Sequence, residues 1–354
     1  MARATREKTG IPLIAELAGV SIGTVDRALH RRAGISAGTL KKVLKVAEEI
    51  GYKPNAAARS LSTGRRVRIG ICVPTEIAYF YDEMWAGIRD EAERYSGRGI
   101  QFVFSPVPEL GRGEQAAFKK LLSAKVEGIV VTPGNPESMT PLIDAAERAG
   151  TRVVCVSTDA PMSRRSSVVC IEPRLNGLIA GELMANFVPP SSKVAVVTGM
   201  LKTIDHREKA EGFAASFQER STGGRVVAVI EAHEHAHESF DKTRSLLNEF
   251  PDLAGIYVNT VNCLPVCRAL ASARRAGQVR VIATDLFRKM IPAIQSGAIA
   301  ASIHQQPYAQ GQLSVRSLAE HLLHQSELIP THYLNPNIIL RSNVNLFREA
   351  GASR

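Results

Sequence analysis

The sequence IAELAGVSIGTVDRAL, at residues 14–29, has the pattern of two short helices joined by a tight turn. Pro12 precedes it, where the first turn of a helix tolerates proline, and the following apolar residues recur at helical spacing. Gly19 interrupts this pattern, and Ser21 is a residue type that caps a helix, here over residues 22–29. Two helices joined by a short turn with a glycine are typical of a helix-turn-helix motif.

A third helix is expected after a polar loop at residues 30–35. Ser36 can cap this helix, its apolar residues recur at helical spacing, and Gly51 ends it. Residues 1–66 carry 13 Lys and Arg against 5 Asp and Glu, a net charge of +8, whereas the rest of the chain carries +2. A basic module with helical periodicity, attached to a nearly neutral body, predicts binding to a polyanion.

Short apolar strands alternate with amphipathic helices from Val67 onward. The first strand lies in RIGICVP, at residues 68–74, and a second set of strands begins with KVAVVTG, at residues 193–199. Alternation of this kind predicts parallel sheets that helices cover on both faces. We therefore expect a small all-α helix-turn-helix domain followed by an α/β domain of two similar lobes.

The composition places the protein in the cytoplasm. The chain has 354 residues, its apolar runs are far too short to span a bilayer, and its basic N-terminus lacks the features of a secretory signal. Five scattered cysteines, mostly inside apolar runs, fit buried and reduced thiols.

Two motifs carry a family resemblance. AGVS-x-x-TV-x-R-x-L at residues 18–29 and GY-x-PN-x-x-ARSL at residues 51–61 resemble the N-terminus of the lactose-repressor (LacI/GalR) family. The rest of the chain resembles the effector domain of that family, which is similar to the type I periplasmic sugar-binding proteins. The resemblance implies a homodimeric or larger transcription regulator that binds double-stranded operator DNA, responds to a sugar or polyol effector, represses transcription and needs no cofactor.

The resemblance also implies a domain layout. Residues 1–50 would form the helix-turn-helix domain and residues 51–66 a hinge helix and linker. Residues 67–354 would form the domain for effector binding and dimerisation. We expect its first lobe at about 67–172 with 303–330, and its second lobe at about 173–302 with 331–354.

The helix at residues 22–29 would be the recognition helix in the major groove. By resemblance, Ile22 and Gly23 read bases, Thr24 contacts a phosphate, and Arg27 pairs with guanine. Asp26 stands where the family usually has serine, and its carboxylate could accept from a cytosine amino group. The alternative is that Thr24 and Arg27 only face solvent. The predicted contacts in this region are Ser21, Ile22, Gly23, Thr24, Asp26 and Arg27.

Residues 55–61 resemble the family's hinge helix, which enters the minor groove. Asn55 begins this segment, Ala58 would allow close approach, Arg59 would contact phosphates, and Leu61 would be the wedge that kinks the duplex. The alternative is that Leu61 packs on the effector domain.

An effector site is expected at the ends of strands, where ligands bind in open α/β sheets. By resemblance, Phe80 and Tyr81 are the aromatic pair that stacks on a sugar, while Arg207 and Asp285 bind its polar groups. Thr260, Val261 and Asn262 follow the run GIYVN, where many relatives carry Asn-Asp, so this chain lacks that acidic group. The predicted effector residues are Phe80, Tyr81, Thr158, Asp159, Arg207, Thr260, Asp285 and Gln305.

Other sites and functions have weaker support. The run at residues 233–238, HEHAHE, could bind a metal, but histidine-rich loops are more often only solvated, and we predict no metal site. Cys263 and Cys267 fit a buried helix face better than a zinc site. No nucleotide motif or catalytic constellation stands out, so we do not expect an enzyme. The alternative function is a sugar-binding protein of a transport system, with no role at DNA.

Overall fold

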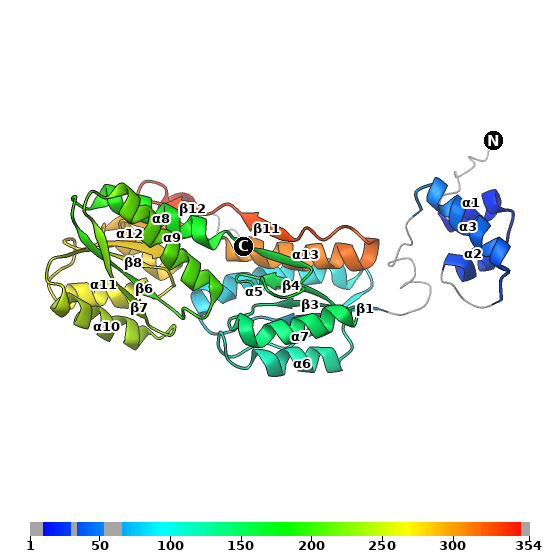
Figure 1. The fold of residues 1–354 in the computed structure, drawn as a ribbon, viewed down its shortest axis with the longest axis horizontal. Helices are drawn as coiled ribbons and strands as arrows, with labels where there is room; N and C mark the ends of the chain where they lie inside the picture. The colour runs from blue at the N-terminus through cyan, green and yellow to red at the C-terminus, as the bar shows by residue number, and fades with distance from the viewer. Residues whose placement is uncertain (1–9, 30–33, 53–65, 348–354) are drawn as a thin grey trace. The chain divides into compact units, whose positions relative to one another are not determined.

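The computed structural model describes residues 10–29, 34–52 and 66–347. The chain divides between Arg65 and Arg66 into two compact units (Figure 1). The predicted hinge contacts Asn55, Ala58, Arg59 and Leu61 lie outside the described residues. None of the described helices is both long and apolar enough to cross a membrane.

The small unit contains the expected helix-turn-helix. Its helices are α1 (Ile11–Ala18), α2 (Ile22–Leu29) and α3 (Ala37–Glu49). They pack around one apolar core formed by Ile14, Ala15, Ala18, Val25, Ala28, Val43 and Ala47. The helical spacing of these side chains is therefore explained by burial of one face of each helix.

Both predicted serine caps are confirmed. The Thr24 amide donates to Ser21 Oγ at 3.2 Å, and the Thr39 amide donates to Ser36 Oγ at 3.1 Å. Gly19 ends α1 with a φ of 64°, which a glycine adopts without steric cost. These local signals fix where α2 begins.

The large unit contains two six-stranded sheets, one in each lobe (Figure 1). The strands are parallel except for one antiparallel pair, β10 and β12. In spatial order, the first sheet holds β11 (Thr331–Leu334), β5 (Ser167–Ile171), β4 (Arg152–Val156), β3 (Gly128–Val131), β1 (Val67–Cys72) and β2 (Ile100–Phe104). The second holds β12 (Asn337–Ile339), β10 (Ala301–His304), β9 (Arg280–Thr284), β8 (Leu253–Val258), β6 (Lys193–Thr198) and β7 (Arg225–Glu231).

Helices cover the sheets, as the alternating pattern predicts. The first lobe has α5 (Ala78–Ser96), α6 (Glu114–Ser123), α7 (Pro136–Arg148) and α13 (Pro307–His324). The second has α8 (Pro173–Phe187), α9 (Ile204–Arg220), α10 (Ala236–Glu249), α11 (Cys263–Ser272) and α12 (Ile291–Gln295), with a short 3-10 turn at Arg288–Met290. All five cysteines are free thiols, and all except the half-buried Cys267 are buried.

The boundaries between the lobes differ from the expected ones. We expected residues 331–354 in the second lobe, but β11 pairs with β5 of the first sheet. We also expected residue 303 onward in the first lobe, but β10 belongs to the second sheet. The run THYL that forms β11 begins with two polar residues and lies at an edge that stays partly exposed. It therefore lacks the continuous apolar run that marks the buried parallel strands.

Glycines bring α8 and α9 into direct backbone contact. A Cβ added to Gly177 would lie 2.1 Å from the Lys209 carbonyl oxygen, and one added to Gly181 would lie 2.5 Å from the Phe213 carbonyl oxygen. Gly212 meets the backbone of α8 in the same way. This close packing fixes the position of α9.

Candidate functional site

The predicted base-reading residues lie at the exposed side of α2. Val25 and Ala28 are buried in the core and Leu29 packs against it, so the opposite face of the helix is exposed. Ile22 has 57% of its surface exposed, and Arg27 is exposed in the last turn. Gly23 is also exposed, while Thr24 and Asp26 are half-buried. The contacts of these residues with DNA stay predictions.

A cavity of about 30 Å³ lies between the two lobes, where the carboxyl ends of both sheets meet. Residues that follow β4, β8, β9 and β10 contribute to its walls. This is the place where open α/β sheets bind ligands. The structure brings six of the eight predicted effector residues together here: Phe80, Tyr81, Thr158, Thr260, Asp285 and Gln305.

A buried lysine organises one side of the cavity. Lys209 is 1% exposed, and its Nζ donates to Asp205 Oδ2 at 2.7 Å and to Gln305 Oε1 at 2.5 Å. The Gln305 side-chain amide in turn donates to Asp285 Oδ2 at 2.7 Å, and its backbone amide to Asp285 Oδ1 at 3.1 Å. This chain of charge-assisted hydrogen bonds holds four polar side chains in fixed positions.

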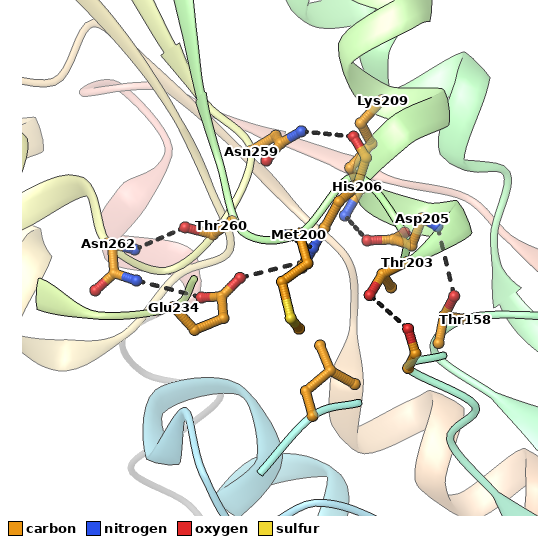
Figure 2. A network of polar contacts seen from close by, with 12 residues as sticks. Thr158, Met200, Thr203, Asp205, His206, Lys209, Glu234, Asn259, Thr260 and Asn262 are labelled. Carbon is orange, nitrogen blue, oxygen red and sulfur yellow. Dashed lines mark hydrogen bonds and ion pairs between the residues drawn. The ribbon is translucent and has the colours of Figure 1, made fainter. Parts of the chain in front are cut away.

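His206 and Glu234 form a second polar pair (Figure 2). The Met200 amide donates to His206 Nδ1 at 3.0 Å, so the ring proton is on Nε2, which lies 3.4 Å from Glu234 Oε1. Burial lowers the pKa of His206 to about 4 and keeps the ring neutral. Burial, reinforced by the nearby carboxylate of Glu76, raises the pKa of Glu234 to about 8. The Asn262 side chain donates to Glu234 Oε2 at 3.2 Å.

Four residues that line the cavity have strained backbones. Ile77, Ser157, Glu234 and Asp285 have φ values of 60°, 71°, 60° and 66°, in the left-handed region that favours glycine. Such conformations cost about 1–3 kcal/mol each and concentrate at ligand sites. Burial also raises the pKa of Asp285 to about 6, against the opposing influence of Lys209.

Hydrogen bonds join the two lobes at the cavity. Thr203 Oγ1, in the second lobe, donates to the Gly134 carbonyl oxygen of the first lobe at 2.7 Å. The Asp205 amide donates to Thr158 Oγ1 at 3.4 Å (Figure 2). Because these bonds cross the cleft, the structure shows the lobes closed over the cavity.

An aromatic stack also crosses the cleft. The ring of Tyr79, in α5, lies parallel to the ring of Phe287, which follows β9, with centroids 4.2 Å apart. Lys289 Nζ lies 5.5 Å from the centre of the Tyr79 ring. Tyr79 remains 39% exposed, so this stack is at the edge of the closed cleft.

Comparison with known proteins agrees with this architecture. Residues 69–326 match the family described as periplasmic binding protein domain, and residues 11–55 match the bacterial regulatory proteins of the lacI family. The chain belongs to the lacI family of bacterial regulatory proteins.

The lacI-family relatives include named regulators. Catabolite control protein A of Priestia megaterium is 25% identical over 249 residues, which cover 70% of this chain and 72% of that protein. The ribose operon repressor of Halalkalibacterium halodurans is 23% identical over 322 residues, which cover 89% and 90%. A solute-binding protein of Bacillus halodurans with bound myo-inositol has a TM-score of 0.74 at 19% identity, covering 80% of this chain and 98% of that one, and shares the fold.

Arg207 of this lacI-family protein lies outside the cavity, contrary to expectation. Its side chain is 46% exposed and lies 3.9 Å from Glu211. Asp205 and Lys209 are one helical turn apart and share the inner face of α9, whereas Arg207 is two residues from each and faces away. The buried cation is therefore Lys209.

Asp159 also lies outside the cavity lining. Its Oδ2 accepts from Arg165 Nη2 at 2.6 Å, and its Oδ1 accepts from Arg165 Nε, which gives a bidentate pair. This pair fixes the loop after β4, which presents Ser157 and Thr158 to the cavity.

The sequence analysis missed four ionisable residues of the cavity: Asp205, His206, Lys209 and Glu234. The spacing of Asp205 and Lys209, one helical turn apart just after a strand, was a usable signal. Glu234 was considered only as part of the histidine-rich run, although it lies in the loop just after β7.

The rest of that histidine-rich run is an exposed cluster. Ligand atoms of His235, His237 and Glu238 lie within 4.8 Å of one another. Both Glu238 oxygens, however, accept hydrogen bonds at 2.9 Å from His233 and His235, and Lys242 donates to one of them at 2.6 Å. These contacts lower the pKa of Glu238, and they satisfy its carboxylate without an ion.

Proposed function

We propose that this lacI-family protein is a sequence-specific DNA-binding repressor whose operator affinity is set by a small polyhydroxylated effector. The observation that carries the proposal is the combination, in one chain, of an exposed helix α2 in a helix-turn-helix unit with a buried polar cavity at the carboxyl ends of two sheets. The first feature suits the major groove of DNA, and the second suits a small ligand.

The cavity chemistry favours a sugar or polyol as effector. Phe80 and Tyr81 supply aromatic surface on one side, with ring centroids 5.0 Å apart in an edge-to-face arrangement. Carboxylates, amides and Lys209 on the other side can hydrogen-bond hydroxyl groups. Solute-binding proteins that share this fold have been crystallised with D-arabinose, D-allose and myo-inositol.

Lobe closure is the step that would couple the effector to DNA. Hydrogen bonds join the two lobes across the cavity, so we expect the lobes to open when a sugar enters. The expected hinge and linker, residues 51–66, directly precede β1 of the first lobe in the sequence. A change in lobe angle would therefore alter the spacing of two hinge segments in a dimer, with a coupling of about 1–3 kcal/mol.

The partners follow from this mechanism. One recognition helix reads only a few base pairs, so we propose a homodimer or larger assembly on a pseudo-palindromic operator of double-stranded DNA. We place the protein in the cytoplasm, with that DNA. The predicted contacts in the hinge, Asn55, Ala58, Arg59 and Leu61, belong to this proposal.

The test combines operator selection with effector screening. Random duplexes enriched on the full-length protein should yield a two-fold symmetric sequence, and Arg27→Ala should relax its preference at one base pair per half-site, at a cost of about 1–3 kcal/mol. A thermal-shift screen over sugars and polyols should yield a ligand that changes operator affinity. A protein that binds sugars but enriches no DNA sequence would instead be the sugar-binding protein of a transport system.

A further inference from the structure

We infer that the effector carries no anionic group: the cavity takes a polyhydroxylated molecule that is neutral or bears an amine, and it rejects sugar acids and sugar phosphates. This inference rests on the proposed function, because it concerns the ligand of the same cavity.

The ionisable side chains that line the cavity are predominantly acidic. The carboxylates of Asp205 and Asp285 outnumber the one cation, Lys209, while Glu234 keeps its proton at neutral pH because its pKa is raised to about 8. His206 adds no charge at neutral pH, since burial lowers the pKa of its ring to about 4. Glu76 is close enough to raise the pKa of Glu234, and it adds to the negative potential. An anion entering this closed space would be opposed by like charges at low dielectric.

Lys209 has little capacity left to neutralise an anion. Two of its three hydrogens are already directed at Asp205 and Gln305. Since Asp285 is held by the same Gln305, recruiting the ammonium group to a phosphate would disrupt the whole chain of hydrogen bonds. The side-chain amides of Asn259, Asn262 and Gln305 also have acceptors already.

The cavity contains buried acceptor atoms that no donor satisfies. Asp205 Oδ1, Glu234 Oε1 and Asn259 Oδ1 are buried and have no hydrogen-bond partner among the described residues, although the His206 ring approaches Glu234 Oε1. Asp205 Oδ1 and Asn259 Oδ1 can accept directly from a ligand, and Glu234 can accept once it is ionised. A buried acceptor without a donor is destabilising. Hydroxyl and ammonium groups can supply the missing donors, whereas carboxylate and phosphate oxygens cannot.

The first experiment compares matched ligands on the full-length protein. Myo-inositol, D-glucose, D-galactose, D-arabinose and D-ribose are each tested by calorimetry beside their amino, acid and phosphate derivatives. We expect the acid and the phosphate to bind at least about 100-fold more weakly than the best neutral or amino form of the same sugar, a ratio that corresponds to 2.7 kcal/mol. An acid or phosphate that binds more tightly than its neutral parent would overturn the inference and leave the proposed effector site intact. Absence of binding by every compound would contradict the sugar effector itself, and the inference would fall with it.

The second experiment uses pH as a probe of ligand polarity. Glu234, faced by His206, Lys209, Asp205, Asp285 and Glu76, has a pKa of about 8 in the ligand-free cavity. A ligand that donates to its carboxylate favours the ionised form, so affinity should rise between pH 6.5 and 8 by up to tenfold per unit. An accepting ligand would favour the protonated form and give the opposite slope, against the inference.

Two variants separate this effect from general changes in the protein. Glu234→Gln should remove the pH slope, because no proton is then exchanged at this position. Glu211→Gln, on the exposed side of α9, should retain the slope and the ligand ranking of the unmodified protein. A slope that persists in Glu234→Gln would assign the titration to another group and remove this support.

Discussion

The two lobes contribute different chemistry to the same cavity. The wall from the first lobe has no charged side chain among its lining residues, which are Ile77, Phe80, Tyr81, Leu110, Ser157 and Thr158. The wall from the second lobe contains every charged group in the lining, namely Asp205, Lys209, Glu234 and Asp285, besides His206, Asn259 and Gln305. The second-lobe wall can therefore bind the polar groups of a ligand, and the first-lobe wall can cover the ligand.

The hydrogen bonds within these walls support this division. The chain that links Asp205, Lys209, Gln305 and Asp285 lies entirely in the second lobe, so it does not depend on closure. Contacts of the first lobe with this wall, such as Thr158 to the Asp205 amide, form only when the lobes meet. We therefore expect effector affinity to depend mainly on side chains of the second lobe, and the equilibrium between open and closed lobes to depend mainly on the first lobe.

Replacement of Lys209 should have the largest effect on the cavity wall of the second lobe. Lys209→Met removes the buried cation and leaves Asp205 without its partner, which should cost about 3–5 kcal/mol of folding stability. Effector affinity should fall at least about 100-fold, which chemical denaturation and calorimetry would measure together. Arg207→Met is the matched control and should leave both quantities unchanged. Equal losses in the two variants would show that the inner face of α9 has no special role.

The stability of the ligand-free protein should depend on Glu234. Its pKa is raised to about 8 from the ordinary 4.5, so the folded state holds a proton that the unfolded state releases, and stability falls as pH rises through this window. Between pH 6.5 and 8 the loss should be about 2 kcal/mol, at 1.36 kcal/mol per unit. His206 contributes a smaller effect of opposite sign near pH 6.5, because it is neutral in the folded state and has an ordinary pKa of 6.5 in the unfolded state. Urea titrations that show the same pH dependence in Glu234→Gln would contradict this assignment.

Tyr79→Ala tests the expected contribution of the first lobe to closure of the cleft. It removes the stack on Phe287 across the cleft, which is worth about 0.5–1.5 kcal/mol beyond its buried area. Effector dissociation measured by stopped flow should therefore accelerate about 2- to 12-fold, with little change in folding stability. Phe104→Ala, at another partly exposed aromatic residue of the first lobe, provides the control. Identical dissociation rates in Tyr79→Ala and the unmodified protein would remove the stack from the closure mechanism.

Local signals predicted the small unit and most strands correctly. The caps at Ser21 and Ser36 and the interruption at Gly19 depend on residues close in sequence, so they can be identified without a structure. Asp285 was assigned by the family resemblance, and it lies directly after an apolar strand, where ligand residues are expected. The short strand β11 was missed because its pairing with β5 is set by a distant part of the chain.

The error at Arg207 has a different cause. The resemblance placed a cation near the start of α9 but did not fix which face of the helix points inward. That face is set by Gly177, Gly181 and Gly212, where α8 and α9 touch. Burial of Lys209 is thus a consequence of helix packing, which a motif at residues 205–213 does not reveal.

We expect the hydrogen-bonded network of the second lobe, and Lys209 in particular, to make operator affinity depend on the bound effector. The direct measurement is operator affinity with and without a saturating effector, in the unmodified protein, Lys209→Ala and Arg207→Ala. We predict that Arg207→Ala keeps the full response, whereas Lys209→Ala binds the operator normally but no longer responds at that effector concentration. A Lys209→Ala protein that responds normally, beside an Arg207→Ala protein that does not, would contradict the account.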